Sequence, residues 1–171
     1  MKSNQSVVLI GMPGAGKSTV GVLLAKELAL DFVDTDVLIQ SREGKTLQEI
    51  MNESDYLNLR RIEGEVIAEA DLPGYVIATG GSAVYSEEGM ANLRRFGAIV
   101  FLSCSAEELR RRIHNYESRG IAKAPGQSFA DLFAERQALY RKYADITIDC
   151  DGRDLQEVLQ AVLAALSDRQ A

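Results

Sequence analysis

One stretch near the N-terminus carries the residues best suited to binding phosphate. It reads Gly11-Met12-Pro13-Gly14-Ala15-Gly16-Lys17-Ser18, followed by Thr19, and fits the phosphate-loop pattern G-x-x-x-x-G-K-[ST]. The backbone N–H groups of such a loop surround an anion at the positive end of the following helix. A lysine in this place reaches the β- and γ-phosphates, and the serine hydroxyl ligates Mg²⁺. The stretch therefore predicts nucleoside triphosphate binding by Gly14, Ala15, Gly16, Lys17, Ser18 and Thr19.

The flanking sequence favours this interpretation over an ordinary glycine turn. Ser6-Val7-Val8-Leu9-Ile10 is typical of a buried strand. After the loop, apolar residues recur at helical spacing, and we expect a helix from about Lys17 to Leu30. Strand, glycine loop and helix, in this order, are the context that the motif requires.

Two further groups follow predicted strands. Phe32-Val33-Asp34 indicates a strand that ends in Asp34-Thr35-Asp36, whose carboxylates suit metal and hydroxyl binding, although a helix cap and turn is an equal alternative. Residues 75–79 predict another buried strand, and Gly80-Gly81-Ser82 follows it, either as bare backbone near a ligand or as a plain turn. Ligands of open parallel sheets bind at the carboxyl ends of the strands, so we expect the loop, the aspartates and the glycines to converge there.

The remaining chain continues the alternation of strands and helices. Apolar runs at residues 98–102 and 146–150 predict two more strands, and amphipathic patterns predict helices that include 55–70, 86–95, 128–143 and 155–166. Five buried strands alternating with helices indicate an α/β fold with three layers and a parallel sheet. A length of 171 residues without a repeat or linker predicts a single domain over residues 1–171.

Two segments could contribute to a ligand site without a motif of their own. Arg60 and Glu63 are three residues apart on a predicted helix, so Glu63 could hold the Arg60 guanidinium for a ligand, although a weak exposed ion pair is the simpler interpretation. Residues 117–127 form a polar segment with glycine and proline, and its length is typical of a mobile lid.

Composition narrows the function further. The net charge of −6 argues against a broad surface for nucleic acid or anionic membranes. Cys104 and Cys150 lack metal-ligand spacing, so we expect reduced thiols. We see neither a signal-peptide pattern nor an apolar run of membrane-spanning length, and we expect a cytoplasmic protein.

Taken in order, these motifs resemble the shikimate kinases, within the nucleoside-monophosphate-kinase-like group of P-loop folds. The resemblance runs from Val7 to the final helix. It rests on the phosphate loop and on Asp34-Thr35-Asp36, Leu59-Arg60-Arg61-Ile62-Glu63, Thr79-Gly80-Gly81, Arg112, Arg119, Glu135-Arg136-Gln137-Ala138-Leu139-Tyr140 and Ala144-Asp145. It implies a sheet of order 2-3-1-4-5 and acceptor-binding helices at about residues 36–70.

The resemblance also implies an activity and its catalytic residues. The activity is transfer of the γ-phosphoryl group of ATP, with Mg²⁺, to a hydroxyl of shikimate, which gives shikimate 3-phosphate in aromatic amino acid biosynthesis. Asp34 would help Ser18 to hold Mg²⁺ through water, and Asp36 would hydrogen-bond the accepting hydroxyl and take its proton. Lys17 and the lid residue Arg119 would neutralise the phosphates.

Further binding roles follow from the same resemblance. Arg60 and Arg136 would clamp the carboxylate of a small carboxylated polyol, against which Gly80 and Gly81 would press their backbone. Guanidinium forks suit a planar carboxylate better than lysines do. On the nucleotide side, the adenine would lie between Arg112 and Arg153. We expect a monomer whose partners are ATP and this acceptor.

Two departures from the family pattern leave other functions open. Ser82 stands where the family usually has a third glycine, and Arg119-Gly120-Ile121-Ala122 stands where its lid usually reads Arg-Pro-Leu-Leu. A side chain at position 82 could narrow the pocket or add a hydrogen bond, and Gly120 loosens the lid. The alternatives are a kinase for another small hydroxy acid, such as gluconate, and a nucleotide-binding module without turnover. We interpret the departures as variation within one acceptor class, because Asp36, Arg60 and Arg136 still describe a carboxylated polyol.

Overall fold

Five parallel strands form one sheet at the centre of the molecule. The structure is a computed structural model and describes residues 5–113 and 121–171. The sheet has the order β2-β3-β1-β4-β5. Its strands are β1 (Ser6–Ile10), β2 (Asp31–Asp34), β3 (Tyr75–Ala78), β4 (Gly97–Ser103) and β5 (Ile146–Asp149). The predicted α/β class and the implied strand order are confirmed.

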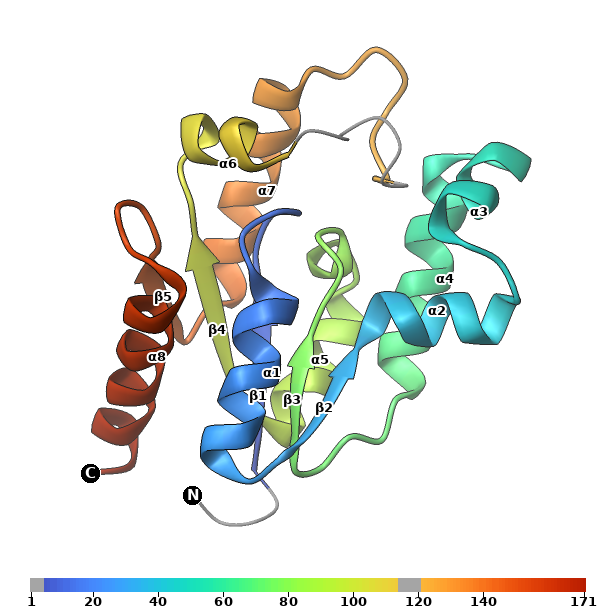
Figure 1. Ribbon diagram of the computed structural model, residues 1–171. Helices are drawn as coiled ribbons and strands as arrows, with labels where there is room; N and C mark the ends of the chain where they lie inside the picture. The colour runs from blue at the N-terminus through green and yellow to red at the C-terminus, as the bar shows by residue number, and fades with distance from the viewer. Residues whose placement is uncertain (1–4, 114–120) are drawn as a thin grey trace.

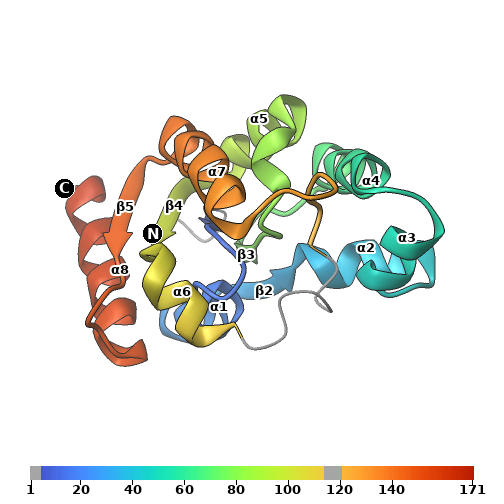
Figure 2. The ribbon, with the colours of Figure 1, turned by 90° about the horizontal axis from the view of Figure 1, so that it is seen from above.

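Helices cover both faces of the sheet, which gives three layers (Figures 1 and 2). Helices α1 and α8 pack together on one face, and α4, α5 and α7 lie on the other. The bounds are α1 (Lys17–Leu28), α2 (Thr35–Glu43), α3 (Leu47–Glu53), α4 (Tyr56–Glu69), the 3₁₀ turn η1 (Ala83–Tyr85), α5 (Glu87–Phe96), α6 (Ala106–Arg112), α7 (Phe129–Tyr143) and α8 (Leu155–Gln170).

The register of the central strands brings their carboxyl ends to one edge. Strand β1 is buried along its whole length, because β3 and β4 flank it and helices cover both faces. Leu9 lies beside Ala78, and Asp34 lies beside the same residue on the opposite side of β3. The loops that follow β1, β2 and β3 therefore begin at the same level of the sheet.

Two predicted elements end earlier than expected, for local reasons. Helix α1 stops at Leu28 because Ala29 takes a left-handed conformation with φ of 53°, and its N–H bonds back to the last turn. Strand β3 ends at Ala78, although Thr79 still bonds the neighbouring strand: its N–H and its hydroxyl both donate to the Leu9 carbonyl oxygen. In the described ranges, 5–113 and 121–171, no helix has the length and apolarity needed to cross a membrane.

A second, smaller core lies beside the sheet. It joins α2, α3 and α4 to the segment after residue 120, and its buried members are Ile39, Ile50, Leu59, Ile62, Val66 and Ala122. Residues 121–128 run from the α4 side to the start of α7, above the carboxyl edge of the sheet (Figures 1 and 2). This arrangement attaches the described part of the predicted lid to the helices predicted to bind the acceptor.

Candidate active site

A cavity of about 290 Å³ opens at the carboxyl edge of the sheet. Its walls come from the segments after β1, β2 and β3, from α4 and α7, and from the segment after residue 120. Most of the predicted site residues line it: Gly14, Gly16, Lys17, Ser18, Thr19, Asp34, Asp36, Gly80, Gly81 and Arg136. Ile39, Leu47 and Leu59, which the sequence did not single out for the site, add an apolar wall.

The phosphate loop is tied together by its own lysine. Gly16 caps α1 with φ of 94°, a left-handed conformation that favours glycine. Lys17 is 7% exposed, and its ammonium group donates to the carbonyl oxygens of Gly11 and Met12, at 2.6 and 2.8 Å. These bonds hold the positive charge at the loop, beside the first turn of α1, where an anion is favoured.

Ser18 and Asp34 connect the phosphate loop to the end of β2. The Ser18 hydroxyl donates to Asp34 Oδ2 at 2.6 Å, and Asp34 Oδ1 accepts the backbone N–H of Asp36 at 2.9 Å. Asp34 is thus the N-cap of α2, as the alternative interpretation of the aspartate pair held, and it also lines the cavity. In the described residues, no three His, Cys, Asp or Glu side chains gather as a metal site. A hydroxyl beside a carboxylate still suits Mg²⁺, which is usually held by few protein oxygens together with water and phosphate.

The glycines after β3 are required by the close approach of other groups. The Gly80 N–H donates to the Thr35 hydroxyl at 3.0 Å, and a Cβ at Gly80 would overlap a carboxylate oxygen of Asp36 and one of Glu63. A Cβ at Gly81 would lie 2.7 Å from Arg136 Nη1. The Tyr140 hydroxyl fixes this backbone, because it donates to the Gly81 carbonyl oxygen at 2.6 Å. Residues 81 and 82 form a turn, and the close approach of charged groups requires glycine at positions 80 and 81.

The two arginines predicted to clamp a carboxylate converge on one oxygen atom. Arg60 Nη2 on α4 and Arg136 Nη2 on α7 donate to the Ala122 carbonyl oxygen, at 3.1 and 2.8 Å. Arg136 is 1% exposed, and burial lowers the pKa of Arg60. The Tyr85 ring lies beneath both guanidinium groups, 3.6 Å from Arg60 Cζ and 5.6 Å from Arg136 Cζ. No local pattern indicated Tyr85, because its role depends on where the two arginines meet.

Both interpretations of the Arg60–Glu63 pair, support of the guanidinium for a ligand and a weak exposed ion pair, are wrong. Glu63 accepts a hydrogen bond from the Ser82 hydroxyl, while Arg60 points to Ala122 and lies 3.9 Å from Glu135. Glu63 is buried, and its pKa is raised to about 7 by burial and by the negative charge of Asp36. Helical spacing allowed the Arg60–Glu63 pair, but the two side chains meet different neighbours on two sides of α4.

Among the residues that the structure describes, four predicted site residues do not line the cavity: Ala15, Arg60, Arg112 and Arg153. Ala15 is buried and donates its N–H to the Met12 carbonyl oxygen. Arg112 pairs with Glu108 at 2.7 Å, and Arg153 lies in the exposed turn after β5. A bond from the Ser105 N–H to Asp151 keeps the segments near Arg112 and Arg153 adjacent. Arg119 lies outside the described residues, as does part of the lid predicted for 117–127.

Comparisons with known proteins assign the chain to a family. A family model described as shikimate kinase matches residues 13–167. The chain belongs to the shikimate kinase family. A shikimate kinase of Pseudomonas syringae pv. tomato is 37% identical over 167 residues, which cover 96% of this chain and 97% of that protein.

Solved structures agree with the family and extend to a wider fold group. A shikimate kinase from Acinetobacter baumannii, solved in complex with shikimate, has a TM-score of 0.87 and 27% identity, with 98% of this chain and 96% of that chain covered. A gluconokinase from Sinorhizobium meliloti has a TM-score of 0.54 and 22% identity, covering 98% and 94%. The second likeness shows the fold alone, whereas the shikimate kinase family accounts for the motifs around the cavity.

Proposed function

We propose that this protein transfers the γ-phosphoryl group of ATP to a hydroxyl of shikimate and forms shikimate 3-phosphate for aromatic amino acid biosynthesis. One observation carries the acceptor class. Arg60 and Arg136 converge on a single oxygen, and Arg136 lines the same cavity as Asp36 and the phosphate loop. A small acid with hydroxyl groups matches this set, and the shikimate-bound relative from A. baumannii supports the choice of shikimate.

The reaction needs alignment and charge neutralisation more than covalent catalysis. The phosphate loop and Lys17 would hold the β- and γ-phosphates beside the first turn of α1. Asp36 would accept a hydrogen bond from the reacting hydroxyl and then take its proton. The hydroxyl oxygen forms a bond to the γ-phosphorus while the bond from that phosphorus to ADP breaks, so atoms and charge balance.

Ser18 and Asp34 would hold Mg²⁺, and the meeting of their oxygens beside the loop supports this role. Bound there with the nucleotide, the ion would neutralise charge that develops on the phosphates. Asp34 has a second task, because its other oxygen caps α2 and so fixes the backbone of Asp36.

The carboxylate of the acceptor would take the position next to Arg60 and Arg136 where the Ala122 carbonyl oxygen lies. The Tyr85 ring under both guanidinium groups would keep them parallel to a planar ligand. Gly80 and Gly81 would offer bare backbone to the acceptor, because side chains at either position would collide with charged groups of the site.

Other expectations complete the proposal and await separate tests. Arg119 would close over the phosphates from a lid at about residues 117–127, and Arg112 and Arg153 would flank the adenine. We further propose a single catalytic domain over residues 1–171, a monomer, and a cytoplasmic location without nucleic-acid or membrane partners.

The decisive experiment measures ADP release with shikimate, gluconate and nucleoside monophosphates in parallel. We expect turnover with shikimate to exceed turnover with the other acceptors by a wide margin. Preference for gluconate would support the alternative kinase, and ATP binding without turnover of any acceptor would support a nucleotide-binding module.

A further inference from the structure

The buried carboxylate of Glu63 has one occupied oxygen and one unoccupied oxygen. Its Oε2 accepts a hydrogen bond from the Ser82 hydroxyl. Within the described part of the chain, its Oε1 has no hydrogen-bond partner, although Glu63 is only 2% exposed. A buried acceptor without a partner costs free energy, so a ligand group that donates to it gains that energy back.

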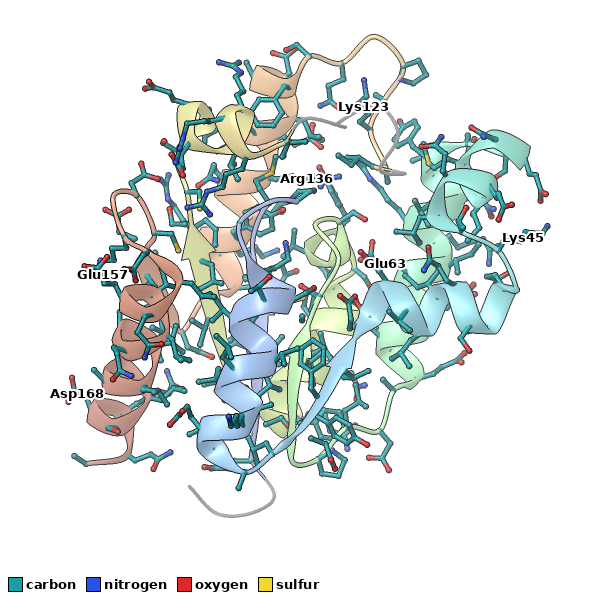
Figure 3. The ribbon with its side chains drawn as sticks, in the orientation of Figure 1. Lys45, Glu63, Lys123, Arg136, Glu157 and Asp168 are labelled. Atoms are coloured by element: carbon teal, nitrogen blue, oxygen red, sulfur yellow. The ribbon has the colours of Figure 1, made fainter. Side chains whose placement is uncertain are left out.

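The unpartnered oxygen is itself buried in the wall of the cavity, beside Gly80. Glu63 and Ser82 both line the cavity, and Oε1 lies against Gly80, at the place where a side chain would also meet Asp36 Oδ1. Figure 3 shows Glu63 and Arg136, from α4 and α7, near the carboxyl ends of the strands. Two carboxylate oxygens side by side suit two hydroxyl groups of one polyol.

The charged groups around Glu63 favour a neutral hydrogen-bond donor as the partner of Oε1. Asp36 is negative, while Arg136 and Lys17 are the positive groups that act on Glu63. Arg136 donates to Ala122, and Lys17 donates to Gly11 and Met12. An acceptor hydroxyl is therefore a better match for Oε1 than another cation.

We propose that Ser82 is a specificity-determining residue, which fixes Glu63 so that Oε1 accepts a hydrogen bond from an acceptor hydroxyl other than the one that is phosphorylated. This inference rests on the proposed function. It gives the departure from the family's third glycine a physical role: the serine hydroxyl bonds one oxygen of the buried carboxylate and so helps to orient the other. In this proposal, Ser82 acts on the acceptor through Glu63.

The test compares shikimate with 4-deoxyshikimate and 5-deoxyshikimate, each of which keeps the reacting hydroxyl. For the analogue that lacks the Glu63 partner, we expect kcat/KM of the parent protein to fall about 5- to 150-fold, mainly through KM. Ser82→Ala should shrink this difference about 3- to 10-fold, because the carboxylate loses its fixed orientation. Ser82→Thr keeps the hydroxyl and should therefore preserve the difference in kcat/KM between shikimate and this analogue.

Ser86→Ala is the matched control. Ser86 caps α5 through a bond from the Gly89 N–H and lies outside the cavity wall, so its loss affects stability without touching Glu63. If Ser82→Ala fails to fold, Ser82→Gly replaces it, since glycine is the usual family residue. Equal discrimination in the parent and in the Ser82→Ala or Ser82→Gly variant overturns the inference and leaves shikimate turnover standing. A parent that does not phosphorylate shikimate at all overturns the proposed function, and the inference with it.

Discussion

The phosphate side and the acceptor side of the cavity are built in different ways. The phosphate side comes from one continuous stretch, in which Gly16 caps α1 and Lys17 bonds to its own loop. The acceptor side brings together α4, α7, the β3–η1 segment and the residues after 120. Local backbone geometry fixes the first, whereas packing between distant segments fixes the second, so the two sides should respond differently to substitution.

The largest effect is expected on the phosphate side. Lys17→Met should lower kcat about 100- to 1,000-fold, because it removes a charge that stabilises the transferring phosphoryl group. Coupled ADP release measures the rate, and circular dichroism checks that the fold is retained. Full activity in a folded variant would contradict the kinase assignment.

The acceptor side should lose binding without losing nucleotide affinity. Arg136→Lys should weaken shikimate binding about 10- to 150-fold, since an ammonium cannot replace a buried guanidinium fork. Titration calorimetry with shikimate and with ATP separates the two sites. Arg61→Lys is the matched control, because Arg61 is an exposed arginine of α4 that pairs with Glu65. An equal loss of ATP affinity would show that Arg136 does not act on the acceptor side alone.

Glu63 belongs to the acceptor side of the cavity, and its ionisation should make the free energy of unfolding depend on pH. Its pKa rises from an ordinary 4.5 to about 7, so the folded state binds more protons than the unfolded state between these values. The contribution of this group to stability therefore falls as pH rises from 4.5 to 7 and stays low above that. Glu63→Gln should raise the free energy of unfolding by about 1–3 kcal/mol at pH 8 relative to the parent.

Urea unfolding of the parent and of Glu63→Gln at pH 5 and pH 8 measures this difference. We expect the two proteins to be nearly equal at pH 5, where Glu63 is protonated in the folded state. A constant difference between the proteins at both pH values would contradict a raised pKa for Glu63.

The smallest effect should appear where the two sides meet. Ser18→Ala removes the hydroxyl that bonds Asp34 and should raise the Mg²⁺ concentration for half-maximal activity about 2- to 12-fold. A metal titration at saturating ATP and shikimate measures it. Val22→Ala is a suitable comparison, because Val22 is exposed on the same helix and does not line the cavity. An unchanged titration for Ser18→Ala would remove this serine from the metal site.

The sequence by itself determined the features that depend on neighbours along the chain. The apolar run of β1, the glycine loop and the start of α1 follow from local periodicity and backbone preference. The alternation of strands and helices determined the fold class, and the family resemblance supplied the strand order. The sequence also predicts site roles for Arg60, Arg136, Gly80 and Gly81, because these residues stand in motifs of the family.

Only the tertiary structure decided which side chains meet around the acceptor. Arg60 and Arg136 converge on the Ala122 carbonyl oxygen, and the Tyr85 ring lies against both guanidinium groups. Glu63 accepts a hydrogen bond from Ser82, whereas helical spacing indicated Arg60 as its partner. Spacing along a helix says which residues share a face, but it does not say which distant backbone packs against that face. The raised pKa of Glu63 has the same origin, because burial and the nearby Asp36 depend on the packing of α4 against the ends of the strands.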